Sequence, residues 1–194
     1  MEITKAKSLQ IINRVLRRNR GVETSWHPEF IKHISDVLQP SVYAEIGIYE
    51  GETFSIVSSP RKYAVDISQA ALDSIPDSAE TIKILGNSKA LSEQLSQNGT
   101  KIDLIFIDAN HDKAEVSQDF INLEPHFSHE CLVLFHDTYP KNLEYSDPKF
   151  CGDAYAAIPM LAAKYTNWAF VTIPIHPGLT IASRSPLYPK WLRS

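Results

Sequence analysis

The sequence predicts an α/β protein built as a three-layer sandwich, with a mostly parallel seven-stranded sheet between helices and an antiparallel hairpin at its end. Two observations support this class. Apolar runs suited to strands alternate with segments whose apolar residues recur at helical spacing. Four runs, VYAEIG, TIKILGNS, IDLIFIDANHD and CLVLFHDT, break into polar residues at their ends. Ligands of parallel sheets bind beyond the carboxyl ends of the strands, so these endings predict one shared site.

Two helices are predicted before the first strand. From Lys5 to about Arg18 apolar residues recur at helical spacing between basic ones, which indicates an amphipathic helix with a solvated basic face. A second helix should begin near Pro28, a residue suited to a first helical turn, and end at Pro40. Its predicted inward side chains are Phe30, Ile34, Val37 and Leu38. We expect these helices, within residues 1–40, to cover the substrate.

The parallel strands are predicted from the apolar runs. They cover residues 42–46, 62–65, 81–85, 102–107 and 131–135. The helices that connect them should begin near Glu52, at Ser68, at an N-cap Ser88 and at Asp112, whose spacing to Glu115 resembles a capping box. The helix from Ser68 should end at Ile75 and that from Asp112 near Leu123, and the helix after Ser88 should bury Leu91 and Leu95.

The last part of the chain is less regular. Thr138 to Gly152 form a long polar connection, and loops of this length in a compact domain are usually lids, so we expect it to cover the substrate. A helix from Asp153 to Tyr165 should be kinked or divided by Pro159. Residues 168–173 and 179–183 read as two strands with a short turn between them, which predicts the terminal hairpin.

The overall composition limits the function classes. At 194 residues the chain should form one domain, residues 1–194. A net charge of -4 argues against a nucleic-acid binder, and no apolar run is suited to a membrane. The first residues lack the apolar core of a secretion signal, so we expect a cytoplasmic protein. Cys131 and Cys151 lack metal-site spacing. The subunit number, including a homo-oligomer, is left open.

The first strand-to-helix turn points to a nucleoside ligand. Gly47 and Gly51, which follow the acid Glu45, would let the backbone approach a ligand at the amino end of a helix. Asp66 closes the next strand, at the spacing from which an acid accepts hydrogen bonds from ribose hydroxyls. Close packing alone would also explain the glycines. A dinucleotide fingerprint is absent, because the turn reads GIYEG in place of GxGxxG, and Glu50 would repel a pyrophosphate.

These motifs resemble those of the class I S-adenosylmethionine-dependent methyltransferases, which have a Rossmann-like fold. EIGIYEG is similar to their first motif, VDIS to their second, and the hairpin before PGLTIASR to their reversed last strand. The resemblance runs from about Trp26 to Arg184 and implies S-adenosylmethionine as the cofactor. Tyr49 departs from the pattern, because many members have a third glycine there.

The resemblance also implies which residues hold the cofactor. They are Glu45, Gly47, Gly51, Asp66, Asn87, Ser88 and Asp108. Gly47 and Gly51 would lie against the methionine part, and Asp66 would take the ribose hydroxyls. Asn87 and Ser88 would border the adenine.

Asp108 and Asp137 close the fourth and fifth strands and are candidate metal ligands. Neighbouring strands lie about 4.8 Å apart, so adjacent carboxylates could share one cation. With two carboxylates, Mg²⁺ or a similar divalent ion completed by water and substrate oxygens fits best. The alternative is that Asp108 only orients the cofactor and Asp137 caps a turn.

His111 lies three residues after Asp108 and is our candidate general base. An imidazole can take a proton from a hydroxyl at neutral pH, particularly from one acidified by a metal. IDANH with the later HD resembles the metal-dependent O-methyltransferases of macrolide sugars, catechol-like compounds and acyl-CoA phenols. That resemblance implies catalytic roles for Asp108 and His111. His136 is either a further ligand or, as we slightly favour, a strand-end residue. No role is predicted for His27, His33, His126, His129 and His176.

The sequence therefore predicts an S-adenosylmethionine-dependent methyltransferase acting on a hydroxyl oxygen of a small molecule, without nucleic-acid or membrane partners. Three alternatives remain. A metal-dependent hydrolase would use Asp108, His111, His136 and Asp137 with no nucleoside. A non-catalytic member of the fold would bind the cofactor without a competent base. A dinucleotide oxidoreductase is weaker, because the turn and the final hairpin do not match it.

Overall fold

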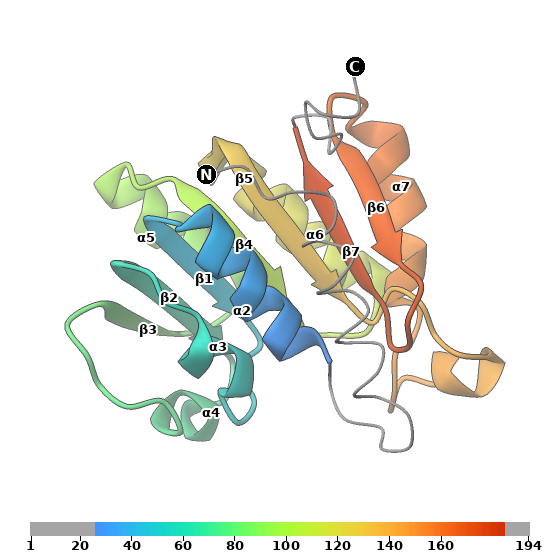
Figure 1. The fold of residues 1–194 in the computed structure, drawn as a ribbon, viewed down its shortest axis with the longest axis horizontal. Coiled ribbons are helices and arrows are strands. Elements are labelled where there is room, and N and C mark those ends of the chain that lie inside the picture. The colour runs from blue at the N-terminus through green and yellow to red at the C-terminus, as the bar shows by residue number, and fades with distance from the viewer. Residues whose placement is uncertain (1–25, 185–194) are drawn as a thin grey trace.

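The computed structural model describes residues 26–184, so the helix predicted from Lys5 to Arg18 lies outside the described residues. The chain forms a seven-stranded sheet in the order β3-β2-β1-β4-β5-β7-β6, with helices on both faces (Figure 1). Strands β1 to β5 pair in parallel, whereas β7 is antiparallel to both of its neighbours. The predicted fold class is confirmed.

The strand bounds follow the predicted apolar runs closely. The strands are β1 (Val42–Ile46), β2 (Arg61–Asp66), β3 (Thr81–Leu85), β4 (Ile102–Ile107), β5 (Phe127–His136), β6 (Ala169–Ile173) and β7 (Leu179–Ser183). β5 is the one that differs most, because it begins at Phe127, four residues before the predicted start at Cys131.

The α-helices range from five to twelve residues in length. The α-helices are α2 (His27–Leu38), α3 (Glu52–Ile56), α4 (Gln69–Asp73), α5 (Ser88–Asn98), α6 (Lys113–Leu123) and α7 (Ala157–Lys164). The 3₁₀ helices are η1 (Glu124–His126), η2 (Leu143–Ser146) and η3 (Ala154–Ala156). None of the helices in the described part of the chain is long and apolar enough to cross a membrane.

Two apolar clusters, one on each face, hold the layers together. Ile31 of α2, Phe54 of α3 and Leu72 of α4 belong to the first cluster. Helices α5, α6 and α7 contribute to the second, in which the predicted Leu91 and Leu95 are fully buried. Strands buried on both faces have apolar side chains on both, which explains why the parallel strands read as continuous apolar runs.

The inward face of α2 differs from the prediction. Val37 is 52% exposed, while Ile31 is fully buried. The two lie six positions apart, about 120° around the helix. Ser35 takes the inward position instead, and its Oγ donates to the Ser58 carbonyl at 3.2 Å. The other predicted inward residues, Phe30, Ile34 and Leu38, are partly buried against the same cluster.

Two helix starts also differ by a residue. The N-cap of α5 is Asn87, whose Oδ1 accepts from Lys89 N at 3.1 Å, so the predicted cap Ser88 is wrong. Ser68 is the N-cap of α4, which ends at Asp73 rather than at Ile75. Asp112 caps α6 as predicted, with its carboxylate accepting from the backbone of the first turn.

The predicted helix from Asp153 to Tyr165 is divided into η3 and α7. The division falls before Ala157, while Pro159 lies in the first turn of α7. A proline is tolerated there because the first N–H groups of a helix have no partner within it.

Candidate active site

A cleft of about 1030 Å³ opens at the carboxyl ends of β1, β2, β4 and β5. Gly47 and Asp66 line one part of it, and Asp108, His111, His136 and Asp137 line another. Strand ends that are far apart in the sequence thus meet at one edge of the sheet, as parallel pairing requires.

The turn after β1 packs tightly against the end of β4. Gly47 has φ +87°, and a Cβ atom there would lie 2.6 Å from Ala109 Cα. Asp66 ties β2 to the same turn, because its Oδ2 accepts from Ile48 N at 2.7 Å. Its Oδ1 accepts from Ser68 N at 2.8 Å. Close packing therefore accounts for Gly47, and the Asp66 carboxylate is held rigidly at the rim of the cleft.

Tyr49 and Gly51 complete this turn. Gly51 has φ +74° and is the N-cap of α3. Tyr49 also has a positive φ, +51°, and its side chain is 80% exposed beside the cleft. A left-handed backbone is costly for a bulky residue, which is consistent with the glycine that many methyltransferases have at this position.

Glu45 lies beneath the cleft and does not line it. It is buried, and the Tyr43 hydroxyl donates a hydrogen bond to its carboxylate. Burial raises the pKa of Glu45 to about 8, although the hydrogen bond from Tyr43 and the charge of Lys62 act in the opposite direction. The acid of the first motif is thus an internal group of the fold.

Asn87 and Ser88 line a second hollow of about 630 Å³, together with Asn110 and Asp119. Ser88 is buried, and its Oγ accepts from Asn122 Nδ2 at 2.9 Å. Burial raises the pKa of Asp119 to about 6. Asn110 and Ala109 are adjacent in the sequence, so the second hollow begins next to the first.

Four side chains with ionisable groups form a connected cluster in the first cleft. His136 Nδ1 lies 2.9 Å from Asp108 Oδ1 and 3.4 Å from Asp137 Oδ2. His111 Nε2 lies 3.0 Å from Asp137 Oδ2. Asp137 has φ +58°, an unusual backbone conformation at a candidate functional site.

The carboxylates and imidazoles of this cluster shift one another's pKa values toward their charged forms. Burial lowers the pKa of His136, but Asp108 and Asp137 outweigh it and raise the pKa to about 10. Burial also raises the pKa of Asp137, but the bonds from His111 and His136 hold it well below its usual range. The bond to Asp137 raises the pKa of His111 above 6.5.

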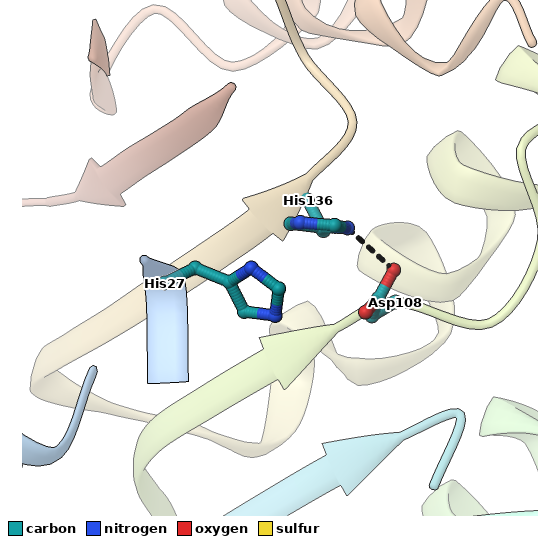
Figure 2. A group of neighbouring side chains, drawn as sticks. All are labelled: His27, Asp108 and His136. Carbon is teal, nitrogen blue, oxygen red and sulfur yellow. Dashed lines mark hydrogen bonds and ion pairs between the residues drawn. The ribbon is translucent and has the colours of Figure 1, made fainter. Parts of the chain in front are cut away.

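His27, which the sequence analysis left without a role, lies against this cluster. It is the first residue of α2, and its ring centroid is 4.0 Å from that of His136. Burial lowers the pKa of His27 to about 3, so its ring is neutral. Figure 2 shows His27, Asp108 and His136 converging from a helix and two strands. The sequence shows that His27 precedes Pro28 at the start of a helix. It does not show where that helix packs on the sheet, so it could not place His27 in the site.

The connection after β5 supplies a further wall of the cleft. Tyr145, Lys149, Phe150 and Cys151 line the cleft, and they belong to the connection over residues 138–152 that we expected to cover the substrate. This wall is fastened to the candidate base, because Asp153 N donates to the His111 carbonyl at 2.9 Å. Burial and the nearby Asp137 raise the pKa of Cys151 to about 12, so the thiol is protonated.

The hairpin turn between β6 and β7 also lines the cleft, next to the connection after β5. His176 and Pro177 line the cleft, and the His176 ring lies 4.4 Å from the Tyr145 ring between centroids. Trp26 Nε1 donates to the His176 carbonyl at 3.0 Å. The start of α2, the hairpin and the connection after β5 therefore meet over the cleft.

Comparison with known protein families gives a match over about half of the chain. The family model described as a methyltransferase domain matches residues 44–138. No curated protein sequence matches the chain.

Solved structures match over almost the whole chain. The O-methyltransferase TomG from Streptomyces achromogenes, involved in tomaymycin synthesis and solved with SAM, is 15% identical, with a TM-score of 0.68 over 94% of this chain and 90% of TomG. An O-methyltransferase from Bacillus cereus in complex with SAH is 14% identical, with a TM-score of 0.64 over 94% and 92%. The SAH-bound methyltransferase PaMTH1 from Podospora anserina is 13% identical, with a TM-score of 0.64 over 96% and 98%. At these identities the likeness establishes the fold.

Proposed function

Because the chain carries a methyltransferase domain within a class I methyltransferase fold, we propose that it transfers a methyl group from S-adenosylmethionine to a hydroxyl oxygen of a small molecule. The observation that carries this proposal is the single cleft shared by Asp66 and Asp108 with His111. Asp66, the proposed ribose acceptor, and His111, the proposed base, lie at the same edge of the sheet, which supports the proposal.

The cofactor would occupy the side of the cleft formed by β1 and β2. Asp66 still has carboxylate lone pairs to accept from the ribose hydroxyls, and its backbone bonds fix its position. The turn from Gly47 to Gly51 would lie against the methionine part. Asn87 and Ser88 would border the adenine from the second hollow. Glu45 would support the turn from below rather than touch the cofactor.

The acceptor would lie between the cofactor and the wall formed by Tyr145 and Phe150. S-adenosylmethionine supplies the methyl group, which moves from the sulfonium sulfur to the acceptor oxygen. His111 takes the hydroxyl proton. The Nε2 atom of His111 is paired with Asp137, so Nδ1 is the nitrogen that can accept the proton. The products are a methyl ether and S-adenosylhomocysteine, and the proton passes to His111. Much of the rate would come from holding the reactants at attack distance.

A divalent cation would assist at Asp108 and Asp137, whose carboxylates both face the cleft. One oxygen of each carboxylate lies within 4.8 Å of the other, which supports a shared cation. The ion would lower the pKa of the acceptor hydroxyl. Mg²⁺ or another divalent ion meets this requirement.

The alternatives lack comparable support. A hydrolase without a nucleoside does not explain the methyltransferase domain, and a dinucleotide oxidoreductase does not explain the reversed final hairpin. A non-catalytic member would lack a base, whereas His111 is paired with Asp137 inside the cleft. As part of this proposal the enzyme acts in the cytoplasm on free small molecules rather than on nucleic acids.

Calorimetry with S-adenosylhomocysteine and a turnover assay with catechol as the acceptor probe test the proposal. Asp66→Ala should weaken cofactor binding, because it removes the ribose acceptor. His111→Ala should leave cofactor binding unchanged but lower turnover by about 10² to 10⁴.

Asp73→Ala on α4 and His129→Ala, both at exposed positions, are the matched controls. Equal cofactor affinity in wild type and Asp66→Ala would refute the cofactor assignment. Unchanged turnover in His111→Ala would refute the assignment of the base.

A further inference from the structure

We propose that His27, Asp108 and His136 form a site for a divalent transition-metal ion, bound by two imidazole nitrogens and one carboxylate oxygen. This metal site rests on the proposed function, because the bound ion would act on the acceptor hydroxyl of the methyl transfer. Two carboxylates alone favour an all-oxygen Mg²⁺ site. The site proposed here takes its place and has two nitrogen ligands and one oxygen ligand.

The three side chains already converge on a common point. One ligand atom from each lies within 4.8 Å of the other two. The closest pair is His136 Nδ1 and Asp108 Oδ1 at 2.9 Å. Figure 2 shows the His27 ring with one nitrogen directed toward the Asp108 carboxylate, which His136 also contacts. Ligands of one ion bound at about 2.1 Å lie roughly 3 to 3.5 Å apart, so small rotations of the side chains would close the site.

The ligand types select the class of ion. Mg²⁺ prefers carboxylate, carbonyl and water oxygens, whereas imidazole suits Zn²⁺, Co²⁺, Fe²⁺ and Ni²⁺. Two histidines and one carboxylate leave further coordination positions for an acceptor hydroxyl or water. Asp108 and Asp137 alone predict a hard cation, whereas the two imidazoles favour a transition-metal ion.

The surrounding packing holds the two rings in place. The His27 ring lies 5.6 Å and the His136 ring 5.9 Å from the Phe106 ring, between centroids. The start of α2 is fixed by the bond from Trp26 to the His176 carbonyl. Asp137 Oδ2 lies 3.4 Å from His136 Nδ1 and would support the site from outside.

One polar atom of this group is left unsatisfied by the protein. Nε2 of His136 is buried, and no described residue forms a hydrogen bond with it. Buried polar groups in native proteins usually have a partner. The nitrogen of His136 assigned to the ion is Nδ1, so the orphaned Nε2 shows only that the hydrogen bonds of the cluster do not satisfy this ring completely.

A rival set shares Asp108 with the proposed one. Asp108, His111 and Asp137 also have ligand atoms within 4.8 Å of one another. That set offers one imidazole nitrogen against two in the proposed set, and each set contains one carboxylate–imidazole pair within hydrogen-bond distance. His27 and His111 each belong to one set alone, so substituting them separates the two.

The test is a titration of the full-length protein with CoCl₂ in the absence of S-adenosylmethionine, followed by the visible absorption of bound Co²⁺ and by calorimetry. We expect His27→Ala and His136→Ala each to weaken Co²⁺ binding by about tenfold or more. His111→Ala should retain wild-type affinity, and MgCl₂ should bind more weakly than CoCl₂.

His33→Ala, also on α2 but outside the cluster, is the matched control, and circular dichroism checks that each variant is folded. Loss of Co²⁺ binding in His111→Ala with retention in His27→Ala would overturn the proposal, as would tighter binding of Mg²⁺ or no metal binding at all. S-adenosylhomocysteine affinity is measured in parallel. If the cofactor binds and Co²⁺ does not, the metal site fails while the methyltransferase assignment stands.

Discussion

Glu45 shows how one residue of a binding motif can act inside the fold rather than in the site. Its carboxyl is buried with the Tyr43 hydroxyl, and the Nζ of Lys62 donates nearby to the Val57 carbonyl at 2.9 Å. Burial raises the pKa of Glu45 to about 8 against 4.5 for the ordinary group. The folded protein therefore keeps a proton that the unfolded chain releases between these two pH values.

This difference predicts how stability depends on pH. The unfolded chain loses the proton as the pH rises above about 4.5, while the folded protein holds it until about pH 8. The free energy of unfolding should fall across this window, by an amount on the order of 4 kcal/mol, and then level off. In Glu45→Gln the side chain cannot ionise, so the free energy of unfolding should no longer fall by this amount between the two pH values. Urea unfolding at pH 5 and pH 8 measures it.

Glu93→Gln, which removes an exposed carboxylate from α5, is the control. If Glu45→Gln and wild type lost the same stability between the two pH values, Glu45 would not be protonated in the folded protein.

Individual residues differed in how far the sequence could predict them. Asp66, Asp108 and Asp137 were found because they end parallel strands, and the sheet brings such ends together. His27 was missed, because its place depends on how α2 docks across the strand ends. The roles of all of these residues stay predictions until binding and turnover are measured.

At the scale of elements, the turn at Gly152 and Asp153 joins the wall of the cleft to the candidate base. Gly152 has φ +54°, and a Cβ atom there would lie 2.8 Å from the Cβ of His111. Lys113 N donates to Asp153 Oδ1 at 2.8 Å, so the turn is also fastened to the start of α6. Residues 111–113 and 152–153 therefore form one packed unit.

Gly152→Ala should push His111 away from Asp137 and lower turnover by about 100-fold, since small misplacements of a catalytic group are costly. Cofactor affinity should stay unchanged, because the turn lies on the acceptor side. Steady-state kinetics and calorimetry measure the two effects.

Gly99→Ala is a matched control. Gly99 also has a positive φ, +66°, but a Cβ there would meet nothing within 4 Å. It tests backbone strain alone, which we expect to cost about 1 kcal/mol of stability. Equal turnover in the two variants would show that the turn does not position the base.

Elements with a strong periodic signal were predicted well, and the connections were not. Strands β1, β3 and β4 have the predicted bounds, because their apolar runs end at glycine, asparagine or aspartate. The cap at Asn87 was misplaced by one residue, since asparagine and serine are both good N-caps. The conformation of residues 138–153 depends on tertiary contacts with His111, which no local pattern reveals.

At the scale of the whole molecule, the cleft gathers residues from both halves of the sheet. Asp66 belongs to β2, Asp108 follows β4, and His176 precedes β7. A ligand bound there would stabilise these elements together, because it binds the folded protein and not the unfolded chain.

S-adenosylhomocysteine at a free concentration of 100 times its dissociation constant should add about 2.7 kcal/mol to the free energy of unfolding. For a chain of this size that corresponds to a rise in Tm of about 5 to 11 °C. Differential scanning fluorimetry measures the shift. NAD at the same concentration should cause none, because the turn after β1 lacks the dinucleotide fingerprint. A larger shift with NAD would favour the oxidoreductase alternative.

The reversed strand β7 has a consequence for how this protein can vary. Because β7 runs antiparallel between β5 and β6, the turn that joins it to β6 emerges beside the end of β5. There Tyr139 N donates to the Pro177 carbonyl at 2.8 Å, and His176 lines the cleft. Insertions in this turn would alter which acceptors fit without moving β1 and β2, where we propose that the nucleoside binds. Acceptor choice and cofactor choice are thus free to evolve separately on one scaffold.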